Sequence, residues 1–199
     1  MDYSPLMDRL ALARTPPKER ADAARNRKVV LEAAAALFRE HGVDGVSMDA
    51  IAAAAGVGKG TLFRRFGDKA GLAVALLDEQ ERALQEAILF GPAPLGPNGA
   101  ATPAERLQSF VDAYLDYLLA HLALVRMSET ASPGARYRIG SYDFWHRHVS
   151  LLLPSDDPAA DAHTLLASLA AEHVHAMLPV LGPERLRRSI LASFCGNSA

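Results

Sequence analysis

The sequence predicts an all-α protein that is built in two parts. Alanine is abundant, and no run of alternating Val, Ile and Thr is long enough for a β-strand. Apolar residues recur instead at intervals of three and four, the period of helices that bury one face. The stretch "GPAPLGPNGAATP" (91–103) interrupts this pattern, because a helix does not continue through so many Pro and Gly residues.

The N-terminal part is expected to begin with a flexible arm and to continue as helices. The arm covers residues 1–24, which contain three prolines and little apolar pattern. Apolar spacing predicts the first helix over 25–41, and Gly42 is suited to end it. Three further helices are predicted over 48–55, 58–65 and 68–90.

Capping residues set the limits of the second helix. Ser47 is a good N-cap, and Gly56 suits the left-handed conformation that ends many helices. These signals predict a helix–turn–helix motif over 47–66. We expect this motif to lie in a domain of residues 25–71, followed by a second helical domain of residues 72–199.

The second domain is expected to become helical again directly after the Pro- and Gly-rich stretch. Thr102 is suited to cap this helix, Pro103 fits the first helical position, and Glu105 can reach back to complete a capping box. Further helices are predicted over 122–131, 136–153, 158–178 and 183–194, the last of them opened by Gly182-Pro183.

The stretch "AAAAGVGKGTLFRRF" (52–66) raises the question of a phosphate-binding loop. The motif G-x-x-x-x-G-K-[ST] requires glycine at position 53 and a hydroxyl residue at position 60, whereas the sequence has Ala53 and Gly60. The preceding residues also have a helical pattern, although the motif follows a strand. A nucleotide-using enzyme is therefore disfavoured.

A helix–turn–helix explains the same residues better. Gly56 provides a positive φ for the turn, and Leu62 and Phe66 fall one helical turn apart, facing the core. The outward side then carries Lys59, Gly60, Thr61, Phe63, Arg64 and Arg65. A short helix with small residues at its start and cations at its end can enter the major groove of DNA.

The segment "SMDAIAAAAGVGKGTLFRRFGDKAGL" resembles the N-terminal domain of the tetracycline-repressor (TetR) family of bacterial regulators, and the resemblance extends over about residues 25–85. The residues that carry it are Ser47, Ile51-Ala52, Ala55-Gly56-Val57, Gly60, Phe63, Phe66, Lys69 and Leu72. The resemblance implies an N-terminal three-helix DNA-binding domain and a C-terminal helical domain for ligand binding and dimerisation. It also implies a repressor that a small-molecule effector releases from a pseudo-palindromic double-stranded operator.

By this resemblance, Ser47 and Lys69 hold phosphates at helix N-termini. The full predicted DNA-binding set is Ser47, Met48, Gly58, Lys59, Gly60, Thr61, Phe63, Arg64, Arg65 and Lys69. The sequence departs from the family pattern in three places. Gly58 stands where serine is common and Phe63 where tyrosine is usual, and neither offers a hydroxyl group to a phosphate. Ala70-Gly71 stand after Lys69, where an acidic residue is common.

The C-terminal domain is expected to hold the effector and to form the homodimer. The predicted ligand-binding residues are Phe110, Tyr114, Tyr117, Met127, Tyr142, Trp145, His146 and His173. The predicted dimer residues are Leu165, Leu169, Met177, Leu186 and Ile190, on the two most apolar helices. The alternative for any of the aromatic residues is that it only builds the core.

The histidines do not predict a metal site or a catalytic centre. His146 and His148 are two residues apart, as are His173 and His175, which places each pair about 200° apart on a helix. The motif G-x-S-x-G of serine hydrolases is absent. The sequence therefore predicts no metal, no cofactor and no enzymatic activity.

Charge is unevenly distributed along the chain. Residues 1–69 contain 12 Lys and Arg against 9 Asp and Glu, whereas residues 70–199 contain 9 against 14. The excess of basic residues in the N-terminal part indicates that this part alone meets a polyanionic partner.

No apolar run approaches the length of a membrane span, and no signal peptide is evident, so we expect a cytoplasmic protein, associated with the nucleoid when bound to DNA. A helical ligand-binding or interaction protein that does not bind DNA remains the alternative.

Overall fold

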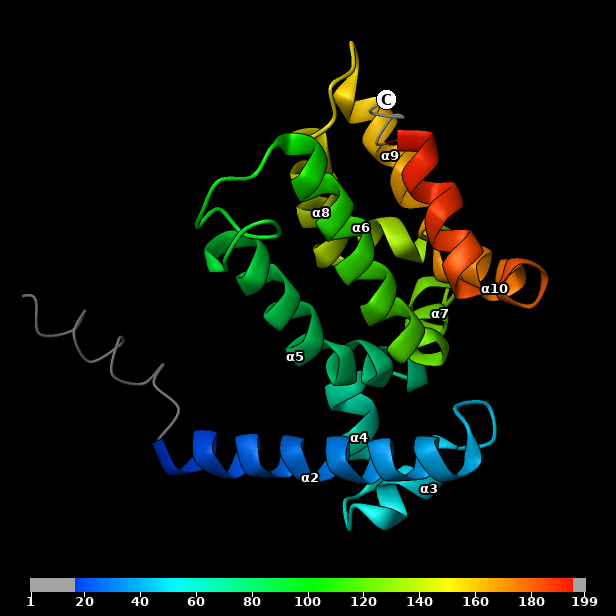
Figure 1. Cartoon of the computed structure of the whole chain (residues 1–199). Coiled ribbons are helices and arrows are strands. Elements are labelled where there is room, and N and C mark those ends of the chain that lie inside the picture. The colour runs from blue at the N-terminus through cyan, green and yellow to red at the C-terminus, as the bar shows by residue number, and fades with distance from the viewer. Residues whose placement is uncertain (1–16, 195–199) are drawn as a thin grey trace, which may run out of the picture. The chain divides into compact units, whose positions relative to one another are not determined.

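The computed structural model describes residues 17–194 of the chain (Figure 1), and within them every regular element is a helix. An isolated bridge between Pro92 and Asn98 is the one β-type pairing in this range. The predicted all-α fold is confirmed. The chain divides between Lys69 and Ala70 into two compact units, whereas the sequence places the boundary after residue 71.

The N-terminal unit consists of α2 (Pro17–His41), α3 (Met48–Ala54) and α4 (Lys59–Phe66). The short helix α3 packs against both α2 and α4. The three helices and the connector before α3 share a small apolar core of Val30, Ala34, Phe38, Val46, Met48, Ile51, Ala52 and Leu62. The unit is therefore held together by contacts between helices that follow one another closely in the chain.

Helix α2 is longer than the sequence pattern predicts. It begins at Pro17, eight residues before the expected start at residue 25. The prediction was wrong there because it relied on apolar spacing, and residues 22–26 are exposed and need no such spacing. Proline is well tolerated in the first turn of a helix, which suits the observed start. Residues 1–16 of the predicted flexible arm lie outside the described residues.

The C-terminal unit contains most of the remaining helices and one 3₁₀ turn. They are α5 (Lys69–Phe90), α6 (Pro103–Ala120), α7 (Leu122–Glu129), η1 (Ala135–Arg138), α8 (Gly140–Ser150), α9 (Pro158–Ser168) and α10 (Ala171–Phe194). Helix α8 packs on α9, and α10 packs on α6, α7 and α9. The core of this unit is centred on Phe110 of α6, Trp145 of α8 and Leu165 of α9.

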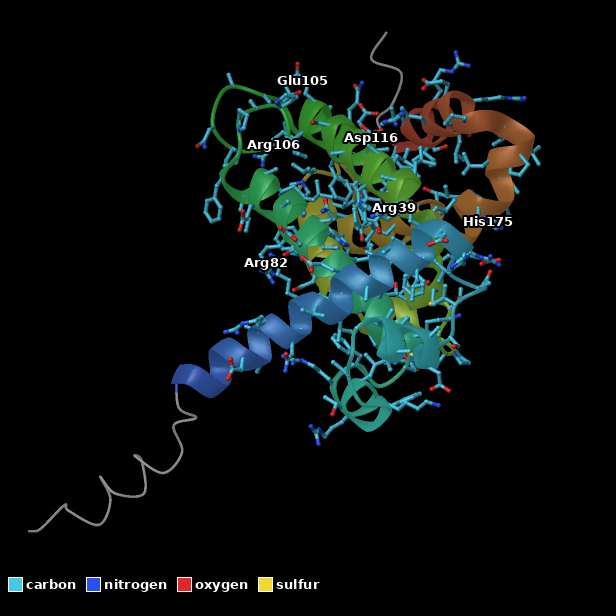
Figure 2. The ribbon with its side chains drawn as sticks, turned by 90° about the horizontal axis from the view of Figure 1, so that it is seen from below. Arg39, Arg82, Glu105, Arg106, Asp116 and His175 are labelled. Atoms are coloured by element: carbon cyan, nitrogen blue, oxygen red, sulfur yellow. The ribbon has the colours of Figure 1, made fainter. Side chains whose placement is uncertain are left out.

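Two local signals at helix starts are confirmed. The Thr102 side chain accepts a hydrogen bond from the Glu105 backbone amide, and the Glu105 carboxylate accepts one from the Thr102 backbone amide, which completes the capping box. Gly182 has a φ of +70°, which breaks α10 into two segments as the sequence predicts for Gly182-Pro183. Arg187, beyond this break, donates to Asp112 and to Asp116 of α6 at 2.8 and 2.5 Å (Figure 2 labels Asp116).

Three other helix limits differ from the predictions. The helix expected over 122–131 ends at Glu129, and the one expected over 136–153 is a 3₁₀ turn and a helix separated by the extended residue Ile139. The helix expected over 158–178 breaks between Ser168 and Ala171. No Pro or Gly occupies this last break, so the sequence contains no local signal for it.

Helices α9 and α10 meet at this break with a bend of 55°. Within residues 17–194 no single helix is both long enough and apolar enough to cross a membrane, and these two satisfy the criteria only as a bent pair.

Candidate functional site

The turn between α3 and α4 has the geometry that the sequence predicts. Ser47 caps α3, because its Oγ accepts a hydrogen bond from the Ala50 amide at 3.1 Å. Gly56 has a φ of +64°, a value that disfavours any residue with a side chain. The Val57 amide then donates to the Ala52 carbonyl at 3.0 Å and closes the turn. This backbone sets the direction in which α4 leaves the motif.

Helix α4 has one buried residue and a broad exposed face. Leu62 is 1% exposed and anchors the helix in the core, whereas Phe63 is 45% exposed. Thr61, Arg64 and Arg65 are exposed on the same helix. Helix α4 therefore presents an aromatic side chain and two cations on its exposed face.

Two glycines at the start of α4 are not required by the fold. A Cβ atom at Gly60 would meet nothing within 4 Å, and one at Gly58 would only reach the Thr61 hydroxyl at 4.0 Å. Neither glycine has a positive φ. Because the free protein has room for side chains here, the absence of side chains is better explained by close approach of a partner to the backbone.

Lys59 is the first residue of α4 and already has a carboxylate partner. Its ammonium group donates to Asp49 of α3, and both side chains are exposed. An exposed ion pair is weak and is screened by salt, so Lys59 can exchange this carboxylate for a phosphate. Within the same unit, the Arg27 guanidinium lies 5.9 Å from the centre of the Phe66 ring.

Two predicted DNA-binding residues have structural roles. Met48 is buried in the core of the N-terminal unit and does not reach its surface. The Lys69 ammonium donates to the carbonyl groups of Val43 and Val46 at 2.8 and 2.9 Å. Lys69 therefore fastens the connector between α2 and α3 in the free protein, and the phosphate contact expected of it stays a prediction.

The C-terminal unit contains a small cavity with a volume of about 20 Å³. Its lining comes from α5, α6, α7 and the η1–α8 segment, and consists of Glu81, Tyr114, Val125, Ser128, Glu129, Arg136, Ile139, Ser141, Tyr142 and Trp145. Three of these residues are aromatic and three are ionisable. Such a combination of apolar walls and a few convergent polar groups is typical of ligand sites.

A buried ion pair in this lining holds the break between α9 and α10. The side chains of Glu129 and Arg136 are 7% and 9% exposed, and Arg136 donates to Glu129. Arg136 also donates to the Leu166 carbonyl near the end of α9 at 2.8 Å. Glu129 accepts from the Ala171 amide at the start of α10, also at 2.8 Å. The pair thus satisfies backbone groups that the broken helix leaves unpaired.

The sequence model of the "Bacterial regulatory proteins, tetR family" matches residues 30–76, which include α3, α4 and the turn described above. This segment is thus similar to the DNA-binding domain of that family. The match supports the predicted function of a DNA-binding transcriptional regulator.

Curated relatives agree with this assignment. An HTH-type transcriptional regulator of Staphylococcus aureus strain MRSA252 is 29% identical over 140 residues, which is 69% of this chain and 73% of the relative. A second one, from strain USA300, is 49% identical over 53 residues, 27% of this chain and 29% of that relative. The stronger identity is thus confined to a short segment.

Solved structures share the fold over most of the chain. A TetR-family regulator from Pectobacterium atrosepticum is 24% identical, with a TM-score of 0.60, and the match covers 90% of this chain and 93% of that one. The structure of AibR in complex with isovaleryl coenzyme A and operator DNA is 20% identical, with a TM-score of 0.55, covering 85% and 97%.

The predicted ligand-binding residues do not all lie at the cavity. Tyr114, Tyr142 and Trp145 line it. Phe110 is fully buried behind it, next to Trp145, and Met127 is not part of the lining. Tyr117 does not line the cavity either, but its hydroxyl donates to Glu81, which does.

The two predicted histidines lie elsewhere. His146 stacks on His163 with ring centroids 4.0 Å apart, and its Nε2 is 3.0 Å from the Ala159 carbonyl. His173 is exposed on α10. The helix predicted over 158–178 would join His173 to Leu165 without a break, but the chain bends after Ser168 and His173 lies on the next helix.

The predicted dimer residues are mostly buried inside the chain itself. Leu165, Leu169, Leu186 and Ile190 belong to the core of the C-terminal unit, and Met177 packs against that core. They were predicted because an apolar stripe has to be buried against another surface, but helices of this same chain bury it. These five residues therefore build or contact the core of the C-terminal unit.

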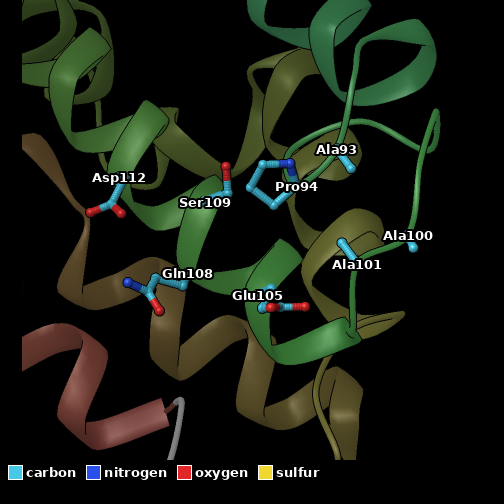
Figure 3. A pocket seen from close by; sticks show the side chains of 8 residues that line it. All are labelled: Ala93, Pro94, Ala100, Ala101, Glu105, Gln108, Ser109 and Asp112. Atoms are coloured by element: carbon cyan, nitrogen blue, oxygen red, sulfur yellow. The ribbon is translucent and has the colours of Figure 1, made fainter.

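A surface groove of about 450 Å³ also lies in the C-terminal unit, between α6 and the segment before it (Figure 3). Its lining is Ala93, Pro94, Ala100, Ala101, Glu105, Gln108, Ser109 and Asp112. Glu105 is engaged in the capping box, and Asp112 is paired with Arg187. The charged groups of the groove thus have structural partners, which makes it a weaker ligand site than the smaller cavity.

The sequence analysis missed the ionisable residues of the cavity. Glu81, Glu129 and Arg136 come from three separate elements, and none of them belongs to a motif. Their one sequence signal is that Arg136 lies two residues after Ser132-Pro133-Gly134, a sequence that interrupts helices. That signal is too common to predict a buried charge.

Proposed function

We propose that the protein is a homodimeric repressor that binds a pseudo-palindromic operator and is released by a small-molecule effector. The observation that carries this proposal is the exposed face of α4, where Phe63, Arg64 and Arg65 project outward while Leu62 fixes the helix in the core. A helix anchored by one residue and otherwise exposed has the form of a recognition helix.

The chemistry of α4 suits the major groove. Arg64 and Arg65 can each donate to phosphates or to a guanine edge, and Phe63 can contact a thymine methyl group. Gly58 and Gly60 allow the start of the helix to come close to the sugar–phosphate backbone. Ser47, Lys59 and Thr61 complete the proposed contacts from the ends of α3 and α4.

Dimerisation follows from the small size of this surface. Helix α4 has eight residues and makes few contacts by itself, whereas two copies can read half-sites about 34–36 Å apart. We assign the dimer contact to the outer faces of α9 and α10. Ala167, Ala176 and Val180 are exposed there, and Val180 is 68% exposed.

The effector is proposed to bind in the cavity of the C-terminal unit and to act through α5. This helix starts at Lys69, the residue that fastens the α2–α3 connector, and also carries Glu81 of the cavity lining. The effector must bind the DNA-competent and the released state with different affinity, because otherwise it shifts no equilibrium. The AibR complex with a coenzyme A ester and operator DNA supports the pairing of the two ligands in one fold.

A titration of the purified protein against the DNA upstream of its own gene, and against a scrambled duplex, tests the proposal. We expect tight binding to the upstream DNA alone, with an affinity that falls with salt while the preference persists. Equal, weak binding to both duplexes that vanishes with salt would contradict operator recognition at that site.

A further inference from the structure

Glu81 is a carboxylate that the fold leaves without a cation. Its Oε1 accepts a hydrogen bond from the Tyr117 hydroxyl at 3.0 Å, and the Ser141 hydroxyl donates to it as well. Within residues 22–194 no Lys, Arg or His forms an ion pair with it, although Glu81 is half-buried. Burial raises the pKa of Glu81 above its usual value, because the charged form is poorly solvated there.

Electron-rich rings surround the same space. Tyr114, Tyr142 and Trp145 line the cavity with Glu81, and all three side chains are buried. The rings of Tyr114 and Trp145 meet edge to face with centroids 5.7 Å apart. Faces of tyrosine and tryptophan attract cations through the ring quadrupole, and more strongly where water is excluded.

The cavity already accommodates one cation in this manner. The Arg136 guanidinium lies 5.6 Å from the centre of the Tyr142 ring and is paired with Glu129. The lining thus contains two carboxylates and one guanidinium, and the guanidinium neutralises Glu129. The carboxylate that lacks a counter-charge is Glu81, on the opposite wall formed by α5.

We propose that this cavity binds a small organic cation of the alkylammonium or arylalkylammonium class. Glu81 neutralises its charge, and its apolar part lies against Tyr114 and Trp145. The inference rests on the proposed function, in that it names the chemical class of the effector. Anions are disfavoured, because the cavity would place them beside two carboxylates and the guanidinium is already paired.

The cavity must enlarge to admit such a ligand, since about 20 Å³ holds roughly one water molecule. The wall that can move is the η1–α8 segment. It is interrupted by Ile139, whose backbone is extended, and it contributes Arg136, Ser141 and Trp145 to the lining. A shift of this wall would also break the hydrogen bond from Arg136 to the Leu166 carbonyl. It would thereby change the contacts at the break between α9 and α10.

Calorimetric titration of the full-length protein without DNA tests this inference. The probes are tetramethylammonium, benzylammonium and benzyltrimethylammonium, with benzyl alcohol as the uncharged control. We expect at least one cation to bind about tenfold or more tightly than benzyl alcohol, because the alcohol lacks the charge that Glu81 and the rings attract. Glu81→Gln should remove that preference, while Glu86→Gln, an exposed change on the same helix, should preserve it.

The pH dependence provides a second readout. Asp78 of α5, Tyr114 and Tyr117 of α6 and Ser141 of α8 are the polar groups that act on Glu81. Affinity for the cation should fall as the pH decreases through the raised pKa of Glu81, and this dependence should disappear in Glu81→Gln. Cation binding that Glu81→Gln leaves unchanged, or no preference for any cation over benzyl alcohol, would overturn the inference.

The outcome is independent of the DNA experiment. Operator binding without cation binding would retain the proposed repressor and reject the cationic effector. Cation binding without any operator binding would retain the site and reject the proposed function.

Discussion

The exposed face of α4 and the cavity of the C-terminal unit differ in how their charged side chains are stabilised. Arg64 and Arg65 stand in water with no carboxylate partner among the described ion pairs, whereas Arg136 and Glu129 are buried against each other. Unpaired charge is inexpensive in water and costly in a protein interior. The arginines of α4 can therefore remain unpaired until a polyanion binds. The charged groups of the cavity must pair with each other until a ligand competes for them.

The two regions also differ in how far along the chain their contacts reach. In the turn motif, Ser47 bonds to Ala50 and Lys59 to Asp49. In the cavity, Glu129 bonds to Ala171 and Arg136 to Leu166. Short-range contacts leave a readable motif in the sequence, whereas long-range contacts depend on the packing of the whole unit.

The largest effect is expected from removing the charges of α4. Arg64→Ala/Arg65→Ala should weaken operator binding about 100-fold or more, since each charge-assisted hydrogen bond is worth about 1.5–3 kcal/mol. The salt dependence of binding should become shallower as well. Electrophoretic mobility shifts at two salt concentrations measure both effects.

The matched control is Arg147→Ala/Arg185→Ala, which removes the same charge from exposed positions of the C-terminal unit. It should leave operator affinity close to that of the wild type. Equal losses in the two double variants would mean that overall charge, and not the face of α4, binds DNA.

Breaking the buried ion pair should have the next largest effect. Glu129→Ala leaves the Arg136 guanidinium buried without its counter-charge and removes the acceptor of the Ala171 amide, so unfolding free energy should fall by about 3–5 kcal/mol. Urea denaturation measures this loss. Arg82→Ala, which breaks the exposed pair with Asp78, should change stability by less than about 1 kcal/mol. A small loss for Glu129→Ala would contradict the role of the pair.

A pH-dependent loss of stability is expected from His148 in the same unit. Burial, together with the positive charge of Arg106, lowers the pKa of His148 from 6.5 to about 4. The unfolded state therefore binds the proton more readily, and stability should fall by about 3 kcal/mol between pH 6.5 and pH 4.

Thermal unfolding at several pH values would show this trend, and His148→Leu should flatten it. Replacement of the exposed His173 by Gln should leave the trend as it is. If His148→Leu retained the full pH dependence, other groups would have to be its source.

The smallest expected effect separates two roles of Lys69. Lys69→Met removes the donor to the Val43 and Val46 carbonyls and should lower stability by about 1–3 kcal/mol. Operator affinity, measured where the variant is fully folded, should change little. A large loss of affinity at unchanged stability would instead restore the phosphate contact that the family resemblance implies.

Local patterns account for what could be predicted. Gly56 adopts the positive φ value expected of it, Gly182 precedes a new helical segment as predicted, and Thr102 and Glu105 form the expected capping box. The direction of Leu62 into the core was likewise predictable from helical spacing alone. Each of these features depends on a few neighbouring residues, so the sequence contains the necessary information.

The sequence could not predict which helices bury each apolar residue. The apolar stripe of Leu165, Leu169, Leu186 and Ile190 indicates burial, but a stripe does not say whether the same chain or a second copy covers it. The same reasoning misjudged Met48, which faces the core of its unit. Burial is a property of the packed molecule, and residue type predicts it only on average.

By itself, the sequence determined the all-helical fold, the turn between α3 and α4, and the set of side chains on the outer face of α4, because these depend on backbone preferences and spacing within a few turns. Only the tertiary structure decided that a continuous apolar run bends after Ser168 and that Glu81 lacks a cation while Arg136 has Glu129. The physical reason is that the bend is held by hydrogen bonds between groups 30 or more residues apart, whose proximity exists only after the helices have packed.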